Sequence, residues 1–362
     1  MERLIRQRLD NHKLLRSNLR AAADVVAWLG AVQSQDFAGA KWALAQRAPG
    51  LTDHSIQQAY DSGAILRTHV MRPTWHFVTP ADIGWLLTLT APRVHRFNAR
   101  YCRVHELDSR TLSRARTILA RALEGGEHLT RAELAAALRR GRIVASGVRL
   151  AFITIDAELN QVMCSGAMRG KQFTYASFQS RVPRSRGLTR EEALAELTRR
   201  YFASHGPATL RDFAWWSGLT MADVKAGVEI LKPAIVCEVV EKVGYWTMAG
   251  LEIRTRPTTA PFAAKVRSPL AHLLPNYDEY VIAYKARSIV GGSPLTIRDA
   301  YTHHLVIDGL LAGTWRQTIA RDSAILDVKH DRTPTASVQR GVQRAAERYG
   351  AFIGKAITLR RP

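Results

Sequence analysis

One pattern occurs three times in the first 250 residues of this chain: two or three helices followed by a pair of short strands. Residues 205–250 contain a helix, a turn at Gly218, a second helix opened by the capping pattern of Thr220 and Asp223, and two alternating strands. Residues 128–178 and 24–78 repeat this order more loosely. A helix, a turn, a helix and a hairpin make up a winged helix. The repeat therefore predicts three such units in series and argues against one large sheet.

The remainder of the chain has a different sequence pattern. Residues 303–330 are typical of antiparallel strands, with turns expected at Asp308-Gly309 and near Gly313, and a last helix over 335–354 precedes a short strand. We predict an α+β protein with three tandem winged-helix domains followed by a small β-rich, barrel-like C-terminal domain. The expected domains are 1–90 (winged helix 1 with an N-terminal helix), 91–122 (a basic helical connector), 123–186 (winged helix 2), 187–256 (winged helix 3) and 257–362 (the β-rich domain).

The charge of the chain limits its partners. Of its 362 residues, 52 are Lys or Arg and 31 are Asp or Glu, which gives a formal net charge of +21. Such a field attracts polyanions, nucleic acid first and a membrane surface second. No apolar run approaches the ~20 residues of a spanning helix, and the charged N-terminus does not resemble a signal peptide. We therefore expect a nucleic-acid partner, no membrane and a cytoplasmic, nucleoid-associated location.

The sequence motifs of several kinds of chemistry are absent. The three cysteines lie far apart and form no CxxC or Cys/His ligand spacing, which indicates a reducing compartment and neither a disulfide framework nor a zinc ribbon. The chain contains no GxxxxGK, GxGxxG or HExxH. We expect no metal and no cofactor.

Two basic segments are candidates for phosphate contacts. In the helical stretch after residue 79, four arginines recur at helical spacing, and Val94, Phe97, Tyr101 and Val104 form an adjacent face that is expected to pack. Farther along, residues 168–190 interleave basic and aromatic side chains. The alternative is an ordinary solvated surface. The candidate DNA contacts here are Arg93, Arg96, Arg100, Arg103, Arg169, Lys171, Arg184 and Arg186.

A pair of glutamines stands between two expected helices, in "GAVQSQDFAGAKW". In a continuous helix Gln33 and Gln35 would point apart, but if the backbone breaks at Ser34 they project from the same side. Two carboxamides then offer two acceptors and four donors to one small object. The alternative is that they cap a helix or face solvent. Asp36 is either a general base or the cap of the next helix.

The first expected wing, "RTHVMRPTWHF", carries further candidates. A wing that faces DNA would use Arg67 and Arg72 for phosphates and place His69 and His76 near the site, while the alternative is that the aromatic residues and a histidine are core. Lys41, on the helix after the glutamines, is another candidate for DNA contact. In the later segment "PNYDEY", Asp278 either supports the site or caps a turn.

Three stretches together resemble a known family: "VQSQD", "LRTHVMRPTWHFV" and "LLPNYDEYVIAY" are similar to segments of the AlkZ/YcaQ family of DNA glycosylases, and the resemblance spans nearly the whole chain. It implies three winged helices and a β-rich domain curved around a basic channel for duplex DNA. The family's catalytic signature is Gln-aliphatic-Gln in the AlkZ branch and Gln-aliphatic-Asp in the YcaQ branch. Gln33 and Gln35 match the AlkZ form, whereas Ser34 departs from the aliphatic residue between them.

The resemblance implies a monofunctional DNA glycosylase that hydrolyses the N-glycosidic bond of N7- or N3-alkylated purines, and also interstrand crosslinks, in double-stranded DNA, acting as a monomer. The chemistry suits weak groups, because a cationic base leaves without a strong acid and only water positioning and charge stabilisation remain. The main alternative is a non-catalytic winged-helix DNA-binding protein or transcription regulator. A basic RNA-binding protein is a third alternative.

Overall fold

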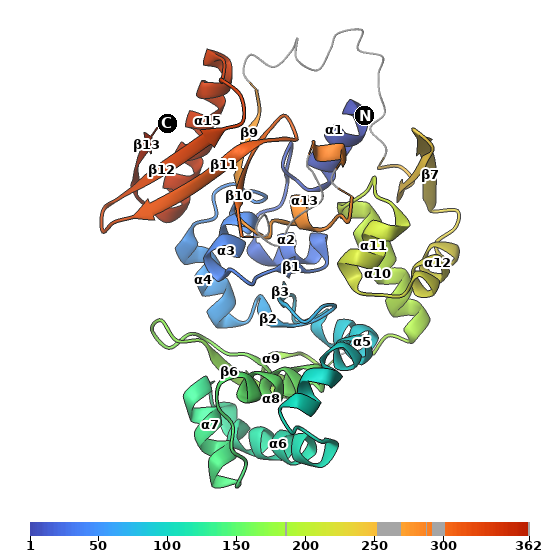
Figure 1. Cartoon of the computed structure of the whole chain (residues 1–362), viewed down its shortest axis with the longest axis vertical. Coiled ribbons are helices and arrows are strands. Elements are labelled where there is room, and N and C mark those ends of the chain that lie inside the picture. The colour runs from blue at the N-terminus through green and yellow to red at the C-terminus, as the bar shows by residue number, and fades with distance from the viewer. Residues whose placement is uncertain (185–186, 252–268, 287, 292–300, 361–362) are drawn as a thin grey trace.

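The computed structural model describes residues 1–184, 187–251, 269–286, 288–291 and 301–360. It is a mixed α+β structure with several small sheets, so the expected fold class is confirmed at that level. Figure 1 shows the helices α6–α8 at one end of the long axis and the C-terminal strands at the other, with α2–α4 between them.

The first repeat unit spans residues 22–78. A separate helix, α1, precedes this unit. The three strands of the unit pair antiparallel in the order β1-β3-β2. The elements are α1 (Glu2–Asn11), α2 (Ala22–Leu29), β1 (Val32–Gln33), α3 (Phe37–Ala45), α4 (Asp53–Ser62), β2 (Leu66–His69) and β3 (Trp75–Val78).

The second repeat unit, residues 109–177, has the same element order and the equivalent strand order, β4-β6-β5. Thr130 and Glu133 form a capping box, because Thr130 accepts from the Glu133 N–H and Glu133 accepts from the Thr130 N–H. The elements are α5 (Ile83–Val104), which connects the two units, α6 (Ser109–Ala122), β4 (Leu129–Thr130), α7 (Arg131–Arg140), α8 (Gly147–Leu159), β5 (Met163–Ser165), β6 (Thr174–Ser177) and α9 (Phe178–Arg181).

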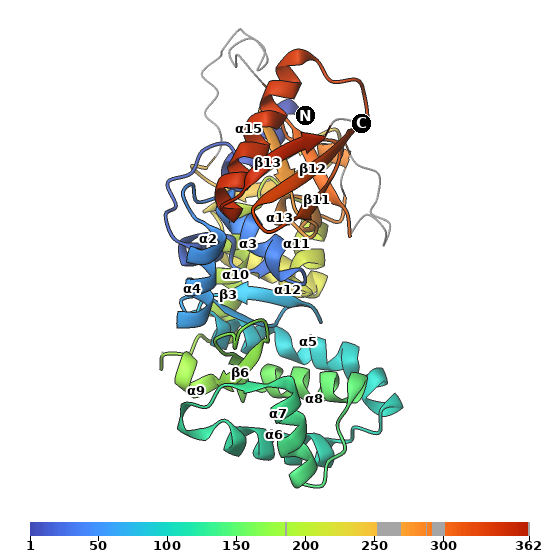
Figure 2. The same cartoon turned by 90° about the vertical axis from the view of Figure 1, so that its left-hand side faces the viewer.

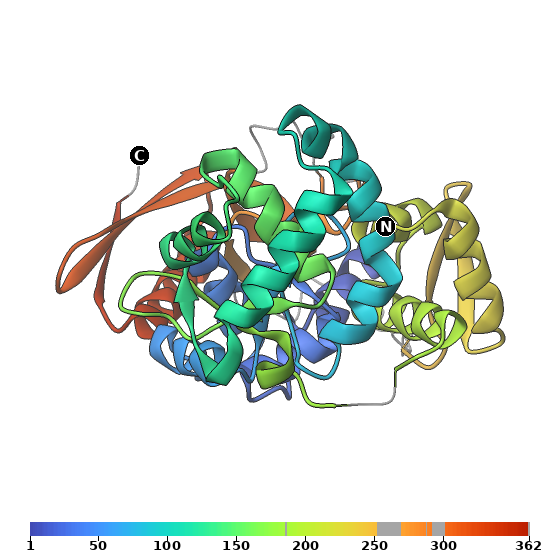
Figure 3. The ribbon, with the colours of Figure 1, turned by 90° about the horizontal axis from the view of Figure 1, so that it is seen from below.

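The third repeat unit, residues 190–248, has three helices and one hairpin. The sequence pattern located its turn and its cap correctly: Gly218 ends one helix with φ 70°, and Thr220 and Asp223 form the capping box of the next. The elements are α10 (Arg190–Ser204), α11 (Leu210–Ser217), α12 (Met221–Ile230), β7 (Ile235–Val240) and β8 (Val243–Met248). In Figure 3 this unit and the C-terminal strands lie on opposite sides of the second unit.

The C-terminal part is built on an open five-stranded sheet in the order β13-β12-β11-β10-β9, half of a barrel, packed against α15. The expected turn near Gly313 is wrong. Gly313 lies inside β11, where any side chain would collide with the backbone oxygen of Lys329, and the strand turns only after Ile319. The elements are β9 (Ala271–Leu274), α13 (Glu279–Ile282), β10 (His303–Ile307), β11 (Leu310–Ile319), β12 (Ser323–His330), α15 (Ala336–Ile353) and β13 (Ala356–Arg360).

Two apolar cores fix the first repeat unit on both sides. One contains side chains of α2, α3 and α4 together with β9, β11, β12 and α15. The other joins the β2–β3 hairpin to α5 and to the helices of the third repeat unit. Helix α3 belongs to the first of these cores and lies beside the C-terminal part of the chain (Figure 1).

The connecting helix α5 differs from its expected packing. Val94 is buried, but Phe97, Tyr101 and Val104 are 60%, 47% and 67% exposed, so the expectation that this face packs is wrong. In the C-terminal half of α5, Cys102 packs against the core of α6–α8, and the ring of Tyr101 stacks on Phe152 of α8.

Candidate active site and nucleic-acid interface

The glutamine pair lies on an extended segment between α2 and α3. The helix break comes earlier than expected, at Gly30, whose φ of 82° ends α2. Gln33 then pairs in the sheet opposite His76. Asp36 caps α3, because its carboxylate accepts from the Gly39 N–H at 3.1 Å. The cap confirms one of the two roles expected of Asp36. The side chain is half-buried, and its second carboxylate oxygen has no hydrogen-bond donor among the described residues.

Both carboxamides are held by the turn between β2 and β3. The Arg72 guanidinium donates to Gln33 Oε1 at 3.0 Å, and the Trp75 N–H donates to Gln35 Oε1 at 3.3 Å. Guanidinium and backbone N–H groups only donate, so each glutamine must turn its oxygen toward the turn. Neither Nε2 has an acceptor within the described part of the chain. Gln33 is 7% exposed and Gln35 is exposed.

The residue between them is fixed through its backbone. The Ser34 N–H donates to the Trp75 oxygen at 2.7 Å, and the Ser34 oxygen accepts from Arg67 Nη2 at 2.9 Å. The side chain is fully buried, and its Oγ has no partner among the described residues. Ser34 thus occupies an interior position in which its hydroxyl does no hydrogen bonding, and the backbone contacts make the segment rigid.

A buried acid that the sequence analysis missed lies behind the pair. Glu279 is fully buried; its Oε1 accepts from the Gln33 N–H at 2.7 Å and its Oε2 from Trp216 Nε1 at 2.9 Å. His205 Nε2 lies 3.6 Å from Oε2. Burial alone would raise the pKa of Glu279, but His205 and the Gln33 N–H favour the charged form and lower that pKa below its usual value. A negative charge therefore sits directly behind Gln33.

The neighbouring acid explains how Glu279 reaches this position. Asp278 and Arg47 form a buried two-point ion pair at 2.7 and 2.8 Å, and Asp278 also accepts from the Tyr280 N–H to start α13. Asp278 thus caps the turn, which is one of the two roles expected of it, and its ion pair with Arg47 fixes the start of α13. Because Arg47 follows α3 directly, the pair ties α13 to the helix that begins at the glutamine motif. The only sequence signal for Glu279 was its place beside Asp278 in "PNYDEY".

The two histidines of the first hairpin are buried. Burial, reinforced by the charge of Arg72, lowers the pKa of His76 to about 3, so the ring is neutral at physiological pH. Its Nδ1 donates to the Thr74 oxygen at 2.9 Å. His69 bonds Glu158 of α8 at 2.5 Å and stacks on Trp75 with ring centres 3.9 Å apart. His69 therefore links the first hairpin to the second repeat unit.

The basic residues near the motif differ in accessibility. Lys41 is nearly buried and paired with Asp53 at 2.8 Å, and Arg67 is 7% exposed among aromatic rings. On the wing of the second repeat unit, Arg169 is exposed and bonds Glu133, and Lys171 is exposed. The structure thus gathers around the motif Gln33, Gln35, Asp36, Lys41, Arg67, His69, Arg72 and His76.

The remaining candidate basic residues lie outside the glutamine motif. All four arginines of the α5 face are exposed, as is Arg184, and none of the four is paired with an acid among the described residues; Arg186 lies outside those residues. Phosphate contact by any of these cations stays a prediction. The four α5 arginines are Arg93, Arg96, Arg100 and Arg103.

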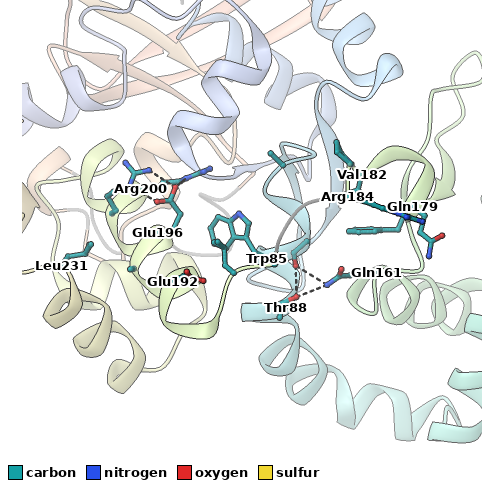
Figure 4. Close-up of a pocket in the computed structure, with 18 residues that line it drawn as sticks. Trp85, Thr88, Gln161, Gln179, Val182, Arg184, Glu192, Glu196, Arg200 and Leu231 are labelled. Atoms are coloured by element: carbon teal, nitrogen blue, oxygen red, sulfur yellow. Dashed lines mark hydrogen bonds and ion pairs between the residues drawn. The ribbon is translucent and has the colours of Figure 1, made fainter.

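A cleft of about 1030 Å³ lies away from the motif between α5, the segment after α9, and α10 (Figure 4). Arg200 pairs there with Asp82 and Glu196, each at 2.6 Å, and Gln161 donates to Thr88 at 3.1 Å. The ion pair of Arg200 with Asp82 joins the third repeat unit to the start of α5, and Gln161, which follows α8, joins the second repeat unit to α5. The cleft thus lies where the second and third repeat units meet α5.

The described residues lack the features of a metal site. They contain no group of three or more His, Cys, Asp or Glu side chains placed to hold a metal ion. Within the same part of the chain, none of the helices has the length and apolar character needed to cross a membrane.

Comparisons with known proteins identify the class to which this chain belongs. The sequence model of the family described as DNA glycosylase AlkZ-like matches residues 26–352. A curated protein of Streptomyces sahachiroi, described as an interstrand DNA cross-link repair glycosylase, is 24% identical over 381 positions, covering 94% of this chain and 92% of its own length. The solved structure of the Streptomyces sahachiroi DNA glycosylase AlkZ superposes with a TM-score of 0.77 at 19% identity, over 100% of this chain and 99% of that one.

The family match, together with the curated glycosylase that aligns with nearly the whole chain, defines this chain as a DNA glycosylase. It belongs to the DNA glycosylase AlkZ-like family, because that match spans most of its length.

Proposed function

We propose that this protein is a monofunctional glycosylase that hydrolyses the N-glycosidic bond of purines alkylated at N7 or N3 in duplex DNA. The observation that carries the proposal is the pair of carboxamides whose oxygens are engaged by Arg72 and Trp75. Because both oxygens face the β2–β3 turn, the amide N–H groups point away from that turn, toward the position where the substrate would bind. It supplies oriented dipoles and no strong acid, which suits a leaving base that is already cationic.

The amide N–H groups of Gln33 and Gln35 hold the attacking water by one lone pair of its oxygen. A water held in this way keeps a second lone pair for attack on the sugar, and its proton needs an acceptor nearby. Asp36 is that acceptor: it follows Gln35 by one residue, it is half buried, and among the described residues its carboxylate accepts only one hydrogen bond, from Gly39. Because the water is already held in place, the entropy cost of bringing it from solution is not part of the barrier of the chemical step.

Glu279 stabilises the positive charge that develops on the sugar. The carboxylate lies behind Gln33 and is excluded from water, so its field is screened little by solvent. His76 supports the same arrangement as a neutral ring, because a charged imidazolium at that position would oppose the sugar cation. An undamaged base remains attached, since none of these groups protonates a neutral purine.

The three repeat units are tandem winged helices, and duplex DNA lies along their basic surfaces. The shared element order of the first two units and the helix pair with hairpin of the third support this assignment. The exposed α5 arginines and the wing residues Arg169 and Lys171 contact phosphates. One chain carries every group named above, so the enzyme acts as a monomer.

Interstrand crosslinks are substrates as well as single adducts. The curated Streptomyces sahachiroi relative is described as a crosslink repair glycosylase, and it aligns with nearly the whole of this chain. A crosslink joined through N7 of two guanines has the same cationic leaving group as a single N7 adduct. Release of one of its two bases is then the same reaction.

The test is release of free base from duplex DNA that contains N7-methylguanine, measured under single-turnover conditions. Gln33→Ala and Gln35→Ala each remove one N–H donor pair and should lower the rate at least tenfold, while affinity for undamaged duplex is unchanged. Asp36→Asn, which retains an oxygen able to accept from Gly39, should lower the rate and keep the fold. Gln46→Ala is the matched control, because Gln46 lies just after α3 and bonds the Leu273 oxygen.

Wild-type protein that binds duplex DNA but releases no base above spontaneous depurination, from this adduct or a crosslink, would contradict the proposal. Such a result would favour a winged-helix DNA-binding protein without catalysis. Loss of DNA affinity in the two glutamine variants would assign those residues to binding.

A further inference from the structure

Two aromatic side chains are exposed on the C-terminal half of α5. Phe97 and Tyr101 stand four residues apart, so they lie one above the other on the same face of the helix. They are 60% and 47% exposed, and their ring centres are 6.3 Å apart. Within the described part of the chain, neither ring belongs to an apolar core. The fold therefore leaves two large rings open to solvent at this place.

The second repeat unit extends these two rings into a row. The ring of Tyr101 stacks on that of Phe152 in α8, with ring centres 5.5 Å apart and 11° between the planes. Phe152 stacks in turn on His105, which follows α5, at 5.9 Å and 28°. Phe152 also packs against the core of α6–α8, so the row is fixed to the fold. Figure 2 shows α5 beside α8, where these rings lie. Phe97, Tyr101, Phe152 and His105 are the ring row.

Positive charge lies next to the ring row. Residues 93–105 contain no Asp or Glu, and the nearby acid of α8, Asp156, is paired with Arg116 at 2.7 Å. Four arginines on the adjoining side of α5 are exposed and have no acidic partner among the described residues: Arg93, Arg96, Arg100 and Arg103. A partner that fits this surface must supply negative charge. A second copy of this chain, with its net charge of +21, does not fit.

The combination of open rings and unpaired cations selects a strand whose bases are unpaired. In a duplex, stacked neighbours cover both faces of each base, so the duplex offers phosphates to arginines but no base face to a ring. A single strand offers both, because its bases stack on aromatic side chains while its phosphates meet the cations. Contact with a duplex would account for the arginines but would leave Phe97 and Tyr101 exposed without a role. Because the chain belongs to a family of DNA glycosylases, the strand is DNA.

We propose that the ring row and the four arginines beside it form a binding site for single-stranded DNA, with bases stacked on Phe97 and Tyr101. The site goes beyond the proposed function, since it uses none of the residues of the glutamine motif and requires no base release. It brings the protein to DNA that contains an unpaired stretch. The arginines hold the phosphates of a paired or an unpaired strand alike, and the rings distinguish between the two.

The experiment measures the affinity of the full chain for two labelled probes, an oligothymidine single strand and a blunt, undamaged duplex of the same length. Fluorescence anisotropy is recorded at one fixed salt concentration. Phe97→Ala removes one stacking ring and should weaken binding to the single strand at least about fivefold, with the duplex affinity of wild type retained. Phe97→Trp keeps a ring and should bind the single strand as wild type does.

The matched control is Ile230→Ala, which removes an apolar side chain that is 47% exposed on α12 of the third repeat unit. It should change neither affinity. Arg96→Ala with Arg100→Ala should weaken binding to both probes, because these cations meet phosphates whether or not the strand is paired. Thermal unfolding of Phe97→Ala should match that of wild type, since the ring packs in no core.

Equal affinity of Phe97→Ala and wild type for the single strand would overturn the inference and leave the ring row to a different partner. An equal loss for both probes would overturn it too, because the ring would then contact the backbone or a groove of the duplex. Neither probe carries a damaged base. The outcome is therefore independent of base release, and failure of the proposed function would leave this test intact.

Discussion

Replacement of Glu279 by glutamine tests whether the buried charge behind Gln33 serves catalysis. Glutamine has the same shape, but an NH2 group stands in place of one carboxylate oxygen. The two oxygens of Glu279 accept from two different donors, the Gln33 N–H and Trp216 Nε1, so one of these donors would face another donor in either orientation of the amide. The variant loses a charge and leaves one buried donor unsatisfied.

The two losses affect different quantities: the unsatisfied donor lowers folding stability, and the missing charge lowers the rate of the chemical step. An unsatisfied donor that formerly bonded a charged group costs about 1.5–3 kcal/mol of folding stability. A sugar cation at about 8 Å from the carboxylate, with an effective dielectric constant of about 20, loses ~2 kcal/mol of stabilisation. That loss corresponds to a decrease of about 30-fold in the rate of the chemical step.

The assay is single-turnover release of N7-methylguanine, with thermal unfolding and duplex affinity measured on the same preparations. Glu279→Gln should be less stable, bind undamaged duplex as wild type does, and react about 30-fold more slowly. Asp212→Asn is the matched control, because Asp212 is also buried and accepts from backbone N–H groups at 2.8 and 3.0 Å, yet none of its hydrogen bonds reaches the motif. It should lose stability and keep its rate. A wild-type rate in Glu279→Gln would refute the reasoning.

Two further predictions concern DNA binding and pH. Arg96→Ala with Arg100→Ala should weaken binding to undamaged duplex and lower the slope of log affinity against log salt by about 0.9 for each phosphate that the protein no longer neutralises; an unchanged slope in a salt titration would place this face away from DNA. Burial lowers the pKa of both His76 and His272 to about 3, so the unfolded chain binds protons that the folded protein refuses. The free energy of unfolding therefore has its full value with respect to these rings above pH 6.5. It decreases as pH falls from 6.5 toward 3, by up to ~1.4 kcal/mol per pH unit for each ring. Urea unfolding at pH 7, 6 and 5 measures this slope, which His76→Gln should reduce.

Local features of the fold were readable from the sequence. Thr220 and Asp223 satisfy the first N–H groups of their own helix, so their signal depends on neighbours three residues away. The glutamine motif was located for a similar reason, although the break that makes it extended is at Gly30. Where the outcome depended on distant partners, the same reasoning failed. Phe97 and Tyr101 have the spacing of a packed face, but little of the fold reaches them.

What the sequence alone determined, then, is the repeated order of elements, the basic character and the identity of the glutamine pair, because each is a property of adjacent residues. What only the tertiary structure decided is the environment of that pair. Glu279 reaches Gln33 from 246 residues away, held there by the ion pair of Asp278 with Arg47, and Arg72 fixes the direction of the Gln33 amide. Charge and hydrogen-bond direction at a buried site depend on which groups the fold brings within about 3 Å, and no spacing along the chain encodes that proximity.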